Sequence, residues 1–186
     1  MRKFLFGIFF LLCYSVEAQF YNAGNEYSGT IRAAAAYTHD FPGLNGGSYS
    51  LEYIRAFNNY LEGGVAAEMV RLNGVPRTAS VEEYTRSSSV GFQLYYLPIK
   101  TQNHIFRLGL GYGFSFYQIR RSYPKYNGEE KNWVVADNKG RSTGIRFSGE
   151  YEYQVPGSRL SIGLRASAGK AYDGITSIGP FIGLRF

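Results

Sequence analysis

Histidine, carboxylate and serine residues that could form a hydrolase site occur near the end of the first predicted strand. His39 precedes Asp40, and folding could bring Ser48, Ser87 or Ser177 close to them. Histidine beside serine, oriented by a carboxylate, is the arrangement that activates a hydroxyl nucleophile. The chain lacks the glycine-flanked serine of a nucleophile elbow, so we favour a histidine at a loop edge with no catalytic role. A lipid-modifying enzyme is the lower alternative.

Metal chemistry has little support in the sequence. The chain contains two histidines and one cysteine. His104 lies beside a predicted turn, at the opposite end of the strands from His39, and Cys13 lies in the N-terminal leader. No group of these residues has the spacing of metal ligands, so we expect no metal and no cofactor.

Charged side chains recur on the face of the predicted strands opposite the apolar side chains. In a soluble core, each unpaired charge would be strongly destabilising. A narrow barrel lumen accommodates such charges as ion pairs, because its interior is just wide enough for side chains. We predict a lumen ion-pair network formed by Arg32, Glu52, Glu62, Glu68, Arg107, Arg146, Glu150, Glu152, Arg165 and Arg185, with Gln93 on the same face. The alternative is that these residues line a narrow channel or bind a small polar solute.

The elements that must position these residues are β-strands. From residue 28 onward, apolar and polar residues alternate in segments of roughly ten residues, which is typical of strands that cross an outer membrane. Residues 105–117 show the pattern best, because every second residue from Phe106 to Phe116 is apolar. The predicted strands are 28–39, 48–57, 60–71, 86–97, 104–118, 143–155, 159–171 and 177–186. In the second strand Arg55 shares the apolar face, which indicates a bulge or an arginine at headgroup level.

The fold class that follows is all-β: an eight-stranded antiparallel up-and-down transmembrane β-barrel, preceded by a cleavable signal peptide. Residues 1–18 form the predicted signal peptide, with Arg2 and Lys3 before an apolar stretch and a small-x-small cleavage site at Val16–Ala18. The barrel domain is then 19–186. Lipidation at Cys13 is a competing interpretation, disfavoured because Leu12 stands where a small residue is expected.

Composition supports this class over its competitors. Charged residues make up 18% of the chain, below the usual quarter or so of a globular protein, and aromatic residues make up 17%. The net charge of +6 is spread along the chain, so we expect no nucleic-acid partner. A soluble lipocalin-like barrel is the fallback, disfavoured because its charges would have to face outward, whereas here they share a face with glycine.

The connectors alternate in length. Short connectors are predicted at 57–60, 98–103 and 156–158, and longer ones at 41–47, 73–85, 120–142 and 172–176. Short periplasmic turns and longer external loops are the usual asymmetry, and an even number of strands places both termini in the periplasm. The longest predicted loop, Arg120–Ser142, is basic and contains Tyr123, Tyr126 and Trp133, so lipid headgroups or a protein partner could bind there.

The C-terminal segment carries the clearest family resemblance. Gly179-Pro180-Phe181-Ile182-Gly183-Leu184-Arg185-Phe186 resembles the assembly signal of small outer-membrane β-barrel proteins of Gram-negative bacteria, with a terminal aromatic residue and apolar residues at alternate positions. The segments 95–100 and 106–116 resemble the mid-barrel hairpin of the outer membrane protein β-barrel domain group. Pro180 departs from an ideal strand because it donates no ladder hydrogen bond.

The resemblance implies a location in the cell outer membrane, in contact with outer-membrane lipid. It also implies that the barrel-assembly machinery recognises Ile182, Leu184 and Phe186, and it says almost nothing about activity. We therefore predict a non-enzymatic outer-membrane barrel with a side-chain-filled lumen, whose external loops engage lipid headgroups or protein partners.

Overall fold

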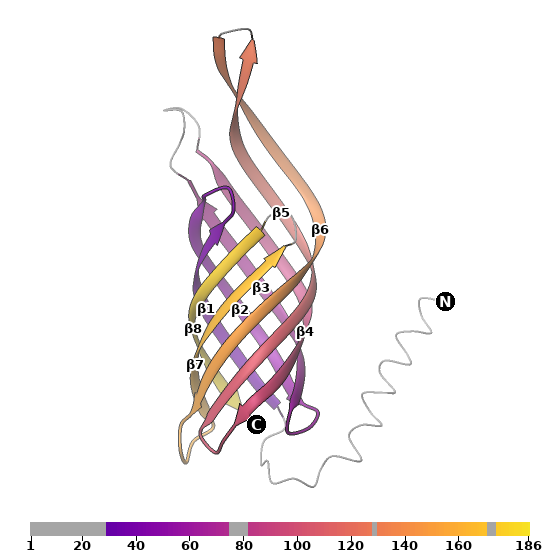
Figure 1. Cartoon of the computed structure of the whole chain (residues 1–186), viewed down its shortest axis with the longest axis vertical. Coiled ribbons are helices and arrows are strands. Elements are labelled where there is room, and N and C mark those ends of the chain that lie inside the picture. The colour runs from indigo at the N-terminus through magenta and orange to yellow at the C-terminus, as the bar shows by residue number, and fades with distance from the viewer. Residues whose placement is uncertain (1–28, 75–81, 128–129, 171–173) are drawn as a thin grey trace, which may run out of the picture.

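The computed structural model describes residues 29–74, 82–127, 130–170 and 174–186. These residues form β1 (Gly29–Asp40), β2 (Asn45–Ala56), β3 (Leu61–Asn73), β4 (Tyr84–Lys100), β5 (His104–Asn127), β6 (Glu130–Gln154), β7 (Leu160–Lys170) and β8 (Gly174–Arg185). Each strand pairs antiparallel with its neighbours in the chain, and β8 pairs with β1 to close a barrel (Figure 1). The predicted fold class is confirmed. The predicted signal peptide and Cys13 lie outside the described residues.

The described part of the chain has no helix that is long and apolar enough to cross a membrane.

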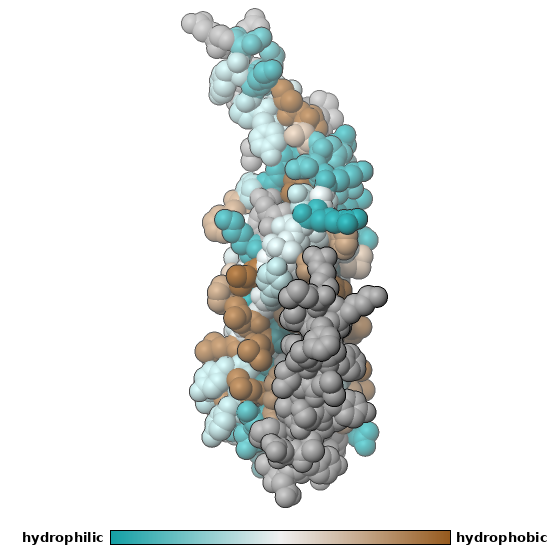
Figure 2. Space-filling model, turned by 90° about the vertical axis from the view of Figure 1, so that its right-hand side faces the viewer, coloured by the Kyte–Doolittle hydropathy of each residue, from teal (hydrophilic) through white to brown (hydrophobic). Residues whose placement is uncertain are grey.

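Alternation along the strands places apolar side chains on the outside of the barrel. In β5 the exposed residues include Phe106, Leu110 and Phe114, whereas Arg107 and Ser115 on the opposite face are buried. The same pattern exposes Val90, Phe92, Ile162 and Ile182 by half or more of their surface, so the outer wall is a belt of apolar side chains. Figure 2 shows hydrophobic residues gathered over the lower part of the barrel and hydrophilic residues toward the hairpin. An apolar surface this continuous is stable against lipid and not against water.

The barrel has two different ends, which we call the termini end and the far end. The termini end carries Gly29, Phe186 and the turns at 57–60, 101–103 and 155–159. The far end carries the connections from β1 to β2, β3 to β4, β5 to β6 and β7 to β8. The turn at the end of β6 is tight enough to require Gly157 at a φ of 69°. Short turns at the end that carries Gly29 and Phe186 match the predicted asymmetry in connector length.

The prediction of a loop at Arg120–Ser142 is wrong. β5 and β6 stay paired from His104 opposite Tyr153 to Asn127 opposite Glu130. The neighbouring strands end earlier, because β4 reaches only Arg120 of β5 and β7 reaches only Ile145 of β6. The remainder is a two-stranded ribbon that projects beyond the barrel (Figure 1). We call residues 121–127 and 130–136 the hairpin. Its β-branched and aromatic residues favour strand, and Pro124 is tolerated because β5 is an edge strand there.

An irregularity occurs in β4 and not in β2. Tyr96 pairs with Leu108, but Ile99 pairs with Phe106, so two residues of β4 lie opposite Arg107. This is a bulge that contains Pro98, and it carries β4 three residues beyond its predicted end at Leu97. The register of β2 is continuous through Arg55, so the bulge considered there is absent.

The seam between β1 and β8 closes the barrel despite Pro180. Ala34 pairs with Phe181 and Tyr37 pairs with Ile178, so the register is the same on both sides of the proline. Between these two pairs, the backbones of β1 and β8 lie close together. A Cβ added at Gly179 would lie only 2.1 Å from the Ala35 carbonyl oxygen. Pro180 therefore interrupts the ladder locally and leaves the strand order intact.

Candidate functional site in the barrel lumen

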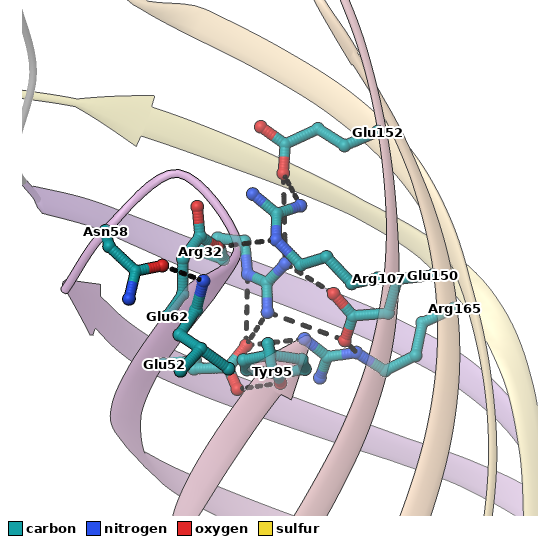
Figure 3. Close-up of polar contacts among 10 residues, drawn as sticks. Arg32, Glu52, Asn58, Glu62, Tyr95, Arg107, Glu150, Glu152 and Arg165 are labelled. Carbon is teal, nitrogen blue, oxygen red and sulfur yellow. Dashed lines mark hydrogen bonds and ion pairs between the residues drawn. The ribbon is translucent and has the colours of Figure 1, made fainter. Parts of the chain in front are cut away.

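Four charged side chains from four strands fill the middle of the lumen, and we call them the central cluster (Figure 3). Arg32 of β1 lies 2.6 Å from a carboxylate oxygen of Glu52 on β2 and 2.6 Å from one of Glu150 on β6. Arg165 of β7 contacts the same two carboxylates at 2.5 and 2.6 Å. Because each arginine bridges both carboxylates, the cluster is a ring of two positive and two negative charges.

Two aromatic side chains enclose this cluster. The Tyr95 hydroxyl donates a hydrogen bond of 2.5 Å to Glu52 Oε1. The guanidinium carbon of Arg32 lies 5.2 Å from the centre of the Tyr95 ring and 4.8 Å from that of Phe181. Sequence reasoning missed both aromatic residues, although strict alternation with the outward Tyr96 and Ile182 was a signal that could have placed them inside.

A second group, the terminal cluster, lies next to the central cluster. Arg107 of β5 lies 2.6 Å from Glu62 of β3 and 2.6 Å from Glu152 of β6. Arg32 is also 3.8 Å from Glu152, so the two clusters are electrostatically continuous. All of these side chains are buried. Each buried charge therefore has opposite charges as neighbours, which is the condition for keeping it in a low-dielectric interior.

Arg185, the last of the predicted network residues on β8, belongs to neither cluster. Its guanidinium donates to Gln154 Oε1 at 2.7 Å and to the Ser158 carbonyl oxygen at 2.8 Å. These contacts tie the end of β8 to the turn that follows β6. The structure thus brings most of the predicted residues into two adjoining clusters and leaves Arg185 at the termini end.

Beyond the central cluster the lumen contains a small chamber. Arg146 donates a hydrogen bond to Glu68 there. Glycine and serine are the commonest residues of the surrounding walls, which also include Gln93. The cavity measures about 70 Å³, which is room for a few water molecules at about 30 Å³ each. Pockets for drug-sized ligands are larger, at about 300–1,000 Å³.

The far end of the lumen holds an ion pair that sequence reasoning missed. Asp40 accepts hydrogen bonds from the Arg121 guanidinium at 2.7 Å and from the Leu44 backbone N–H at 2.7 Å. Leu44 packs with Val70 and Leu72 in a buried apolar group. The alternation of β1 predicts an inward Asp40, but Arg121 stood in a segment predicted as loop, so the pairing could not be foreseen.

The hydrolase arrangement considered for His39 does not form. His39 and Asp40 point to opposite faces of β1, with His39 exposed and Asp40 fully buried. The His39 ring nitrogen Nδ1 lies 2.8 Å from Asn45 Oδ1, and Ser48 accepts a hydrogen bond from Thr38 inside the barrel. No group of three or more potential metal ligands occurs among the described residues.

The predicted assembly residues lie on the outside of the closing strand. Ile182, Leu184 and Phe186 are each about half exposed. The backbone of Phe186 exchanges two hydrogen bonds of 3.0 Å with Gly29, and its ring stacks on Tyr53 with centroids 6.1 Å apart. Phe186 thus connects the last strand to the first at the β1–β8 seam.

Comparison with solved structures relates this architecture to small outer-membrane proteins. Neisserial surface protein A (NspA) aligns with 88% of this chain and 100% of its own, at 14% identity and a TM-score of 0.58. Ail, the attachment invasion locus protein of Yersinia pestis, aligns with 87% of this chain and 100% of its own, at 15% identity and a TM-score of 0.52. No protein-family model and no curated protein matches the chain. The chain has the fold of small eight-stranded outer-membrane β-barrels.

Proposed function

We propose that the protein is a non-enzymatic, non-conducting barrel of the outer membrane that acts through its far end, with both termini in the periplasm. The observation that carries this proposal is the filled lumen. The central and terminal clusters span the barrel with side chains that are almost completely buried. A solute path would have to break several buried ion pairs at once, so the surfaces left to act are outside the lumen.

The hairpin is the most accessible of these surfaces. Tyr123 and Tyr126 on β5 and Trp133 and Val134 on β6 are exposed by between 37% and 65%. Tyrosine and tryptophan are enriched where proteins contact partners, because they combine apolar area with a hydrogen-bonding group. A hydrogen-bonded two-stranded ribbon also presents them at a lower entropic cost than an unpaired loop does. We assign a protein partner to this hairpin.

Planar-bilayer recording tests the closed lumen. The refolded barrel should show no steady single-channel steps, at neutral pH and moderate salt. Reproducible steps of constant size would overturn the proposal in favour of the narrow channel, which is the alternative. Mass analysis of membrane lipids from cells with and without the protein addresses the enzyme alternative, and we expect identical lipid profiles.

Cysteine labelling tests the orientation. In a Cys13→Ser background, Lys125→Cys places a thiol on the hairpin and Gln102→Cys places one in a turn at the termini end. A membrane-impermeant maleimide should label the first in intact cells and the second only after lysis. The reverse pattern would overturn the assignment of the termini to the periplasm.

Replacing the hairpin tests its role. Tyr123 lies opposite Val134, so residues 124–133 can be exchanged for an Asn-Gly turn, which suits a two-residue hairpin. The shortened protein should fold and insert normally but lose its cross-linking to a partner at the cell surface. Unchanged cross-linking would move the interaction to another surface of the far end.

A further inference from the structure

A row of cations runs across the outer wall of the barrel on one side of the far end. In the strand register Arg71 of β3 lies opposite Arg86 of β4, Arg86 opposite Gln118 of β5, and Gln118 opposite Lys139 of β6. Arg141 lies one outward position further along β6, opposite Phe116. Directly opposed residues have their Cβ atoms about 5 Å apart, so these side chains are neighbours although they come from four strands.

These cations line a shallow depression in the outer wall. The depression measures about 550 Å³, and its floor is formed by residues 69–71, 86–88, 116–118 and 139–141. It contains no acidic residue. None of Arg71, Arg86, Lys139 and Arg141 has a carboxylate within ion-pair distance in the described part of the chain. The nearest acid along β6, Asp137, lies opposite Arg120 in the next row.

Aromatic rings hold two of the arginines in place. The Arg86 guanidinium lies 4.9 Å from the Tyr84 ring centre, and Gln118 donates a hydrogen bond of 2.8 Å to the Tyr84 hydroxyl. The Arg141 guanidinium lies 5.4 Å from the Phe116 ring centre. Stacking on a ring leaves the N–H groups of an arginine free to donate, so these side chains are oriented before any ligand arrives.

The outward residues next in line toward the termini end are apolar. Phe116 and Met69 lie in the row that contains Arg141, and Val90 and Phe114 lie in the row after it, about 7 Å further along the strands. All four are at least half exposed on the outer wall. A ligand that covers both the cations and this wall has an anionic head and an apolar tail.

The row is confined to one side of the barrel. Across β8, β1 and β2, the corresponding outward residues are Thr176, His39 and Asn45, which lie opposite one another in the register. The exposed Lys170 at the end of β7 is a single cation, outside the depression. A general attraction of the barrel to an anionic membrane surface would be served by cations all round. A one-sided set inside a depression fits a bound molecule better.

We propose that Arg71, Arg86, Lys139 and Arg141, together the wall site, bind the phosphate-bearing headgroup of a membrane lipid whose acyl chain lies along Phe114 and Val90. Arginine donates paired N–H groups that match phosphate oxygens, and Lys139 adds a point charge. The inference rests on the proposed function, because it requires the far end to lie at a lipid headgroup layer.

Native mass spectrometry tests the wall site. The mature chain, refolded in a neutral detergent, is titrated with phosphatidic acid and, in parallel, with phosphatidylcholine of the same chain length. We expect preferential retention of one phosphatidic acid per barrel. Arg71→Gln with Arg86→Gln should weaken that retention about tenfold or more, since a hydrogen bond to a charged group contributes enough for such a change.

The matched control removes the same charge elsewhere, with Lys125→Gln and Lys170→Gln, and should retain the lipid as the unaltered chain does. An equal loss in both double variants would show that net charge alone attracts the lipid, which overturns the site. Full displacement by an equal concentration of inorganic phosphate would overturn the lipid as its occupant. The assay is done in detergent, so its result does not depend on the orientation in the cell or on whether the lumen conducts. Loss of the wall site would therefore leave the proposed function untouched.

Discussion

At the residue scale, each buried charge of the lumen depends on the opposite charges next to it for its stability. The central cluster places two arginines against two carboxylates, and removal of any one member leaves an excess of the opposite charge in a buried site. A charge stranded in this way is far more costly than the loss of an exposed ion pair. Tyr95 adds a hydrogen bond that orients Glu52. The effects of substitutions in this cluster on the free energy of unfolding should therefore be strongly non-additive.

Arg32→Ala should lower the free energy of unfolding by about 3–5 kcal/mol, because Glu52 and Glu150 are then left with only Arg165. Urea titration in detergent, followed by circular dichroism, measures the change. Lys125→Ala, an exposed hairpin residue, is the control and should change the stability by less than about 0.5 kcal/mol. A comparable loss in both variants would contradict the stabilising role of the cluster.

At the element scale, the seam between β1 and β8 decides whether the sheet closes. A Cβ added at Gly179 would clash with backbone atoms of Ala35 and Ala36 on β1, beside Pro180, where the ladder is interrupted. Gly149 on β6 differs, because a Cβ added there meets no atom within 4 Å. The two glycines offer a matched test of closure on neighbouring parts of the same sheet.

Gly179→Val should greatly reduce the fraction of chains that form a closed barrel, because the added side chain would press on backbone atoms of β1 that cannot move aside. Gly149→Val should fold normally and present its side chain to the lipid. The folded fraction is read from the difference in gel mobility between heated and unheated samples. Equal folding of the two variants would mean that the seam is more adaptable than its geometry indicates.

Phe186 is expected to act in assembly more than in stability. Its backbone bonds to Gly29 do not depend on its ring, so Phe186→Ala should refold in detergent nearly as the unaltered chain does. In cells, its amount in the outer membrane should fall severalfold. Tyr49→Ala, an outward aromatic at the far end, is the control. An equal fall in both variants would contradict a special role of the terminal residue.

At the scale of the whole molecule, charged side chains fill the lumen and apolar side chains cover the outer wall. In the proposed function, this barrel anchors the far end in the membrane. The hairpin and the wall site both lie at that end, one projecting beyond the sheet and the other set into its outer side. Neither requires a passage through the lumen. Because both surfaces lie outside the lumen, a closed barrel can present them at the membrane.

The barrel as a whole should behave as a membrane protein in solution. We expect β-rich circular dichroism in detergent and a faster gel migration before heating than after it, since a closed barrel resists unfolding by dodecyl sulfate. Removal of detergent should precipitate it, because the exposed wall of Phe92, Leu110 and Ile162 then meets water. A monodisperse protein without detergent would contradict the membrane assignment.

The sequence by itself determined the strand number and the face that each residue occupies. Both follow from local geometry, because successive side chains in a strand point to opposite sides whatever the rest of the chain does. This is why Arg32 and Glu150 could be placed inside the barrel, and Phe114 and Ile182 outside it, without any knowledge of their partners.

Only the tertiary structure decided which of these residues meet. Arg32 and Glu150 lie 118 positions apart in the chain, and their contact depends on the closure and stagger of the whole sheet. The register between neighbouring strands aligned Arg71, Arg86 and Lys139 in one row. The length of the hairpin was also beyond local reasoning. Its strand-favouring residues are interspersed with charged ones, and only the pairing between β5 and β6 shows that the strands continue.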